Sequence, residues 1–182
     1  MLFHVRMLKD GVWMLAVLLA AIAGWTDWRS RRIPNWLTFS GLLVGIAANT
    51  LAWGWAGTQT SLLGAGLGLL LLLPLVLLRS LGGGDWKLAG AMGAFVGPHQ
   101  LVLLLIAGVL IAAVMAIILI VWRRRVIQTL RNIVRMLAAF FTFHLPSTEV
   151  SLDNPESLKV PFGVAFAIAV ILYSGGKLLG VS

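Results

Sequence analysis

The chain contains no cysteine among its 182 residues. This absence excludes disulfide bonds, a zinc site ligated by cysteine and a thiol nucleophile, and it leaves the redox compartment undecided. The three histidines, His4, His99 and His144, lie far apart in the sequence and do not form a zinc-binding pattern. The serines and threonines are scattered, and none has a histidine placed to complete a catalytic triad. We therefore expect no metal and no other cofactor.

Charged residues are also scarce. They make up 11% of the chain, whereas hydrophobic residues make up 60%. A soluble domain averages about 25% charged and about 45–50% apolar residues. The mean hydropathy is +0.98, and the apolar residues fall in long blocks. These features predict an all-α polytopic membrane protein, with residues 1–182 forming a single membrane-embedded domain.

Six apolar blocks could cross a bilayer, which takes about 20 helical residues. The predicted spans are residues 12–27, 36–54, 61–78, 85–97, 99–122 and 160–179. The fourth is short, and its helix would reach only about 20 Å against about 30 Å of hydrocarbon. We still expect it to cross, because the arginines that follow the fifth span would otherwise lie on the wrong side of the membrane. In residues 123–143, apolar residues recur at helical spacing with arginines on another face, which predicts a cytoplasmic interfacial helix.

The net charge of +8 has a topological explanation. Basic residues gather after the first, third and fifth predicted spans and are absent from residues 54–60 and from the turn at Pro98. Since basic loops stay in the cytoplasm, both termini are predicted to lie outside it. The N-terminal apolar stretch has its stronger positive flank on its C-terminal side, so we expect an uncleaved span rather than a signal peptide. The bilayer, and not nucleic acid, is the expected partner of these charges.

Two of the six acidic residues stand out. The other four lie in predicted tails or loops, where we expect them to be solvated: Asp10, Glu149, Asp153 and Glu156. Asp27 and Asp85 each lie where a predicted span meets the cytoplasmic face. Acidic residues at membrane depth are costly and are candidates for function. The alternative is an aspartate that reaches the interface and pairs with Arg29 or Lys87.

The context of these two residues favours a catalytic pair. Asp85 ends the run Gly82-Gly83-Gly84-Asp85, whose bare backbone would let a peptide approach closely. An ordinary turn, or an N-cap at Asp85, is the structural alternative. Asp27 opens a stretch that ends in Pro34 and Asn35, residues suited to a helix start. Two close carboxylates can share one proton, so that one activates water while the other protonates the leaving group.

At these stretches the sequence resembles the type IV prepilin peptidases, which belong to the GxGD group of membrane aspartyl proteases. Three stretches carry the resemblance, which covers roughly residues 12–180. They are Asp27 with Ile33-Pro34-Asn35, Gly82-Gly83-Gly84-Asp85 with Lys87-Leu88, and Pro161-Phe162-Gly163.

The resemblance implies an aspartic endopeptidase of the bacterial inner membrane. Its substrate would be a prepilin or pilin-like precursor, cut at the cytoplasmic face after a short basic leader. Asp27 and Asp85 would be catalytic, with support from five neighbours: Gly82, Gly84, Lys87, Pro34 and Asn35. The sequence predicts neither the oligomeric state nor which aspartate holds the proton.

One departure from the family narrows the activity. Many relatives carry a cysteine-rich cytoplasmic insert and also methylate the new pilin N-terminus. Here the loop of residues 28–35 is short and cysteine is absent. The chain therefore resembles the peptidase-only form of tight-adherence pilus systems, without methyltransferase activity or S-adenosylmethionine. A non-enzymatic transporter or pilus-assembly subunit is the alternative, although a transporter would more often place its acids near the bilayer midplane.

Overall fold

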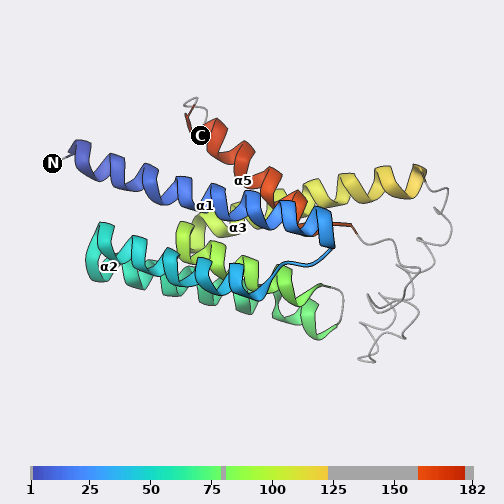
Figure 1. Cartoon of the computed structure of the whole chain (residues 1–182), viewed down its shortest axis with the longest axis horizontal. Helices are drawn as coiled ribbons and strands as arrows, with labels where there is room; N and C mark the ends of the chain where they lie inside the picture. Colours follow the sequence, from blue (N-terminus) through green and yellow to red (C-terminus); the bar gives the residue numbers. More distant parts are fainter. Residues whose placement is uncertain (1, 79–80, 123–159, 179–182) are drawn as a thin grey trace.

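The computed structural model describes residues 2–78, 81–122 and 160–178, and their regular structure is entirely helical (Figure 1). The helices are α1 (Leu2–Ser30), α2 (Asn35–Leu77), α3 (Gly83–Trp122) and α5 (Phe162–Leu178). The predicted all-α class is therefore confirmed for this part of the chain. The predicted interfacial helix, residues 123–143, lies outside the described residues.

Three helical stretches are long and apolar enough to cross a membrane: Asp10–Ser30, α2 and α3. The apolar helix Phe162–Lys177 is shorter than a full span. Large apolar side chains face outward along these helices, among them Leu51, which is 86% exposed. Exposed apolar surface on this scale is expected of a protein that lies in lipid. A membrane protein is thus supported, but the described residues form three long apolar helices and one shorter helix and not six separate spans.

A reversal at Gly54 explains the length of α2. Gly54 has φ 61° and ψ −140°, outside the helical region and accessible mainly to glycine. The hydroxyls of Thr50 and Thr58 lie 2.8 Å apart, although eight residues of straight helix would separate them by about 12 Å along the axis. The two arms, residues 35–53 and 55–77, therefore fold back on each other (Figure 1). The predicted loop over 54–60 was wrong in extent, since helix resumes directly after the glycine.

α3 reverses in the same way at Gly97, which has φ 78°, at the turn predicted beside Pro98. Proline has no N–H, so the carbonyl of Ala94 loses its helical donor. Two buried side chains replace that donor: Asn49 Nδ2 donates to the Ala94 oxygen at 2.8 Å, and Ser61 Oγ donates to it at 2.7 Å. Because Asn49 and Ser61 lie on opposite arms of α2, this contact joins both arms to the reversal in α3.

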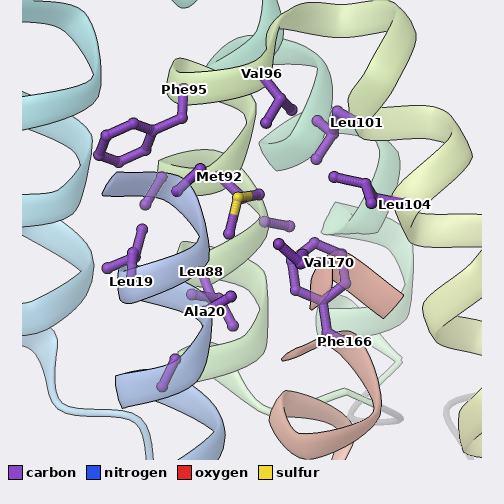
Figure 2. Packing of buried hydrophobic residues seen from close by; sticks show 14 of the residues in the cluster. Leu19, Ala20, Leu88, Met92, Phe95, Val96, Leu101, Leu104, Phe166 and Val170 are labelled. Carbon is purple, nitrogen blue, oxygen red and sulfur yellow. The ribbon is translucent and has the colours of Figure 1, made fainter. Parts of the chain in front are cut away.

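The first arm of α3 forms the centre of the bundle. Residues 88–97 are all buried. Their apolar side chains pack against α1 and α5, and Figure 2 shows Leu88 and Met92 near Ala20 and Phe166. Against the second arm of α2, glycines allow backbone contact, because a Cβ added to Gly64 would overlap the carbonyl oxygen of Gly93. Small residues permit such close approach between membrane helices. This packing fixes the start of α3, where Asp85 lies.

Candidate active site

Asp27 lies in the last turn of α1 and is only 7% exposed. Its Oδ2 accepts a hydrogen bond of 2.9 Å from the backbone N–H of Gly163, which is 136 positions away in the first turn of α5. The first N–H groups of a helix have no partner within the helix, and that end carries partial positive charge. The Asp27 carboxylate therefore binds the start of α5.

The stretch Pro161-Phe162-Gly163 builds this contact. Pro161 precedes α5, and its carbonyl accepts the N–H of Ala165 at 3.3 Å as the first hydrogen bond of the helix. A Cβ added to Gly163 would lie 3.0 Å from both Cβ and Oδ2 of Asp27. Glycine thus lets the helix start approach the carboxylate closely.

Asp85 is the third residue of α3 and is half-buried. The N–H of Trp86 donates to the carbonyl of Gly82 at 3.2 Å, so Gly82 is the cap of the helix. The Asp85 side chain turns back to that cap and accepts a hydrogen bond from the Gly82 amide. In a capping box, the side chain of the third helical residue accepts the backbone N–H of the N-cap residue in the same way. Asp85 is therefore not the N-cap itself, which was the simplest structural alternative.

Ile33 contacts the backbone beside both aspartates. It lies in the connection between α1 and α2, after Arg31, whose φ of 53° ends α1. If a Cβ atom were added to Gly163, it would lie 3.1 Å from Ile33 Cδ1. A Cβ atom added to Gly84 would lie 3.1 Å from Ile33 Cβ. The carboxyl groups of Asp27 and Asp85 are close enough to interact electrostatically. The two predicted residues are thus brought together at one end of the bundle.

The predicted supporting residues surround this pair. Pro34 caps α2, and its carbonyl accepts the N–H of Leu37 at 3.1 Å. Asn35 follows, and its Oδ1 accepts a hydrogen bond of 2.9 Å from Lys87 Nζ. This bond links the start of α2 to the first turn of α3. Gly83 is exposed, with no atom within 4 Å of an added Cβ, so there is open space beside Asp85.

Sequence reasoning gave no structural role to two residues of this site. Gly163 and Ile33 were recognised only as members of the motifs Pro161-Phe162-Gly163 and Ile33-Pro34-Asn35. Their contacts with Asp27 and Gly84 depend on how three helix ends pack, which a linear pattern does not specify. The motif Pro161-Phe162-Gly163 was the available signal, because a glycine in the first turn of an apolar helix needs a packing reason.

Comparison with known proteins identifies the family of the chain. A family model described as the type IV leader peptidase family matches residues 13–117, a range that includes both Asp27 and Asp85. No curated protein and no solved structure gives a significant match. The family match spans more than half of the chain. The chain therefore belongs to the type IV leader peptidase family, which implies an aspartic-type peptidase activity.

Proposed function

We propose that this protein is a membrane aspartyl endopeptidase that removes the short basic leader from type IV prepilin or pilin-like precursors at the cytoplasmic face, with Asp27 and Asp85 as its catalytic pair. The observation that carries the proposal is that the carboxyl groups of Asp27 and Asp85 lie within electrostatic reach of each other at one end of the bundle, beside the open space at Gly83. Both acids lie at helix ends and not in the middle of a span, as a protease acting at the interface requires.

The chemistry needs only the two carboxyl groups and water. The ionised carboxylate takes a proton from the water as its oxygen attacks the scissile carbonyl carbon. The protonated carboxyl group first polarises that carbonyl, and a proton then passes to the leaving nitrogen as the C–N bond breaks. The open backbone at Gly83 suits an extended peptide lying beside the turn that holds Asp85. Lys87, Asn35 and Pro34 support this arrangement by joining the start of α2 to α3.

Co-expression with a candidate precursor tests this function. The precursor should carry a short basic leader directly before a hydrophobic helix. We expect the wild-type chain to give a shorter product whose new N-terminus, read by mass spectrometry, lies at the junction of leader and helix. The Asp27→Asn/Asp85→Asn double variant should leave the precursor whole. Equal processing by both proteins would refute the proposal.

We also propose that the chain crosses the bacterial inner membrane six times, with both termini outside the cytoplasm and the aspartates facing it. The reversals at Gly54 and Gly97 support this topology, because they give α2 and α3 two arms each. The positions of the basic residues support the orientation.

Labelling of single cysteines tests this topology, since the chain has no cysteine of its own. In intact cells, a membrane-impermeant maleimide should react with Gln59→Cys, which lies just after the Gly54 reversal. It should reach Ser30→Cys and Gly83→Cys only after the cytoplasmic face is opened. Labelling of Gly83→Cys in intact cells would contradict the proposed orientation.

A further inference from the structure

The contact between Asp27 and α5 has a consequence for the reaction. Asp27 lies three residues before the end of α1, in a last turn whose backbone is least restrained. Its side chain is nevertheless held from outside that helix, by the N–H of Gly163 at 2.9 Å. The carboxylate is thus oriented by a distant helix and not by its own.

We propose that Gly163 is a positioning residue, which fixes the Asp27 carboxylate for its part in water activation by presenting a backbone N–H with no side chain in the way. This inference rests on the proposed function. An amide N–H can only donate, so the N–H of Gly163 holds Oδ2 of Asp27 in one direction. A reacting group misplaced by about 1 Å can lose about 100-fold in rate.

Ile33 makes the position of Gly163 sensitive to change. A Cβ added to Gly163 would lie 3.0 Å from Asp27 and 3.1 Å from Ile33 Cδ1. Ile33 in turn packs against Gly84, next to Asp85. An alanine at position 163 must therefore displace Asp27, Ile33 or the start of α5. Each of these shifts changes the geometry between the two carboxylates.

Gly163→Ala is the direct test. We expect kcat for precursor cleavage to fall by roughly tenfold, less than the roughly 100-fold for a full misplacement of about 1 Å, with KM within about twofold of the wild type, because the change acts on the geometry of the acids and not on substrate binding. Gly175→Ala is the matched control, since it lies in the same helix and has no atom within 4 Å of an added Cβ. The second change Ile33→Val, which removes Cδ1, should restore part of the lost kcat when added to Gly163→Ala.

Retention of wild-type kcat by Gly163→Ala would overturn the positioning role, and so would a rise in KM with unchanged kcat. Neither result would bear on the proposed function, which depends on the aspartate variants. If Gly163→Ala fails to accumulate as folded protein, hydrogen exchange at the start of α5 decides instead. Asp27→Ala should speed exchange of the Gly163 amide and Asp85→Ala should not. Equal exchange in both variants would overturn the inference.

Discussion

Replacement of either Asp27 or Asp85 by asparagine should lower the rate of precursor cleavage by about 1,000-fold, within the range of about 10²–10⁴ for loss of general acid–base catalysis. Asparagine has nearly the same shape as aspartate, and its side-chain oxygen can still accept the N–H of Gly163 or Gly82. It can neither ionise nor hand on a proton at neutral pH. The amount of folded protein should therefore stay unchanged while the chemistry stops.

Asp10→Asn is the matched control for this experiment. Asp10 lies in α1 like Asp27, but it is exposed at the opposite end of the membrane-spanning stretch. Its replacement should leave the cleavage rate within about twofold, as is usual for a solvated surface group. The rate should be measured on a purified precursor at equal enzyme levels, so that expression does not enter the comparison.

The double variant gives a separate test of the pair. If both carboxylates act in one proton relay, the second substitution should cost little beyond the first, because groups that act as a unit are strongly non-additive. A single variant that keeps more than a tenth of the wild-type rate would show that its aspartate is not catalytic. If both single variants did so, the two acids would serve structure alone, as the capping contact of Asp85 already does in part.

The site was predictable from the sequence to the extent that it depends on local pattern. Long apolar blocks predicted helices, because a backbone in lipid must satisfy its own hydrogen bonds. The positions of basic residues predicted one membrane depth for Asp27 and Asp85, and the structure brings their carboxyl groups within electrostatic reach of each other. Pro34 was predicted at a helix start and caps α2.

The parts that the sequence did not predict depend on contacts between distant segments. The loop predicted over 54–60 reduces to one glycine, since a single residue with positive φ is enough to reverse the chain. Asn49 looks like an ordinary polar residue within an apolar block, yet it donates to the carbonyls of Ala94 and Phe95 beside the α3 reversal. No local pattern announces these partners, because their positions follow from the packing of whole helices.

Gly64→Ala should destabilise the folded protein strongly, although it adds only one methyl group. The added Cβ would overlap the carbonyl oxygen of Gly93, and a Cβ on Gly93 would likewise overlap the carbonyl oxygen of Gly64. Because the obstacle is backbone and not the end of a side chain, rotation cannot relieve it. Overpacking costs typically about 1–3 kcal/mol and occasionally more, and we expect the upper end of that range for Gly64→Ala.

Gly66→Ala supplies the matched control, two residues along the same arm and with no atom within 4 Å of an added Cβ. Glycine lowers helix stability by about 1 kcal/mol relative to alanine, so this variant should be neutral or more stable. Thermal unfolding in detergent should give a lower melting temperature than the wild type for Gly64→Ala, and an equal or higher one for Gly66→Ala. Equal stability would mean that the two arms are not in backbone contact at Gly93.

The Gly64→Ala substitution also connects packing to the site. Gly93 lies on the buried arm that begins with the Asp85 turn, and Gly84 at that turn rests against Ile33. A shift of this arm away from Gly64 would move Asp85 relative to Asp27, whose own anchor lies in α5. We therefore expect the fraction of Gly64→Ala that does fold to cleave precursor more slowly per molecule, whereas Gly66→Ala should cleave at the wild-type rate. A folded Gly64→Ala enzyme with full activity would show that the position of Asp85 is set by the Ile33 contact alone.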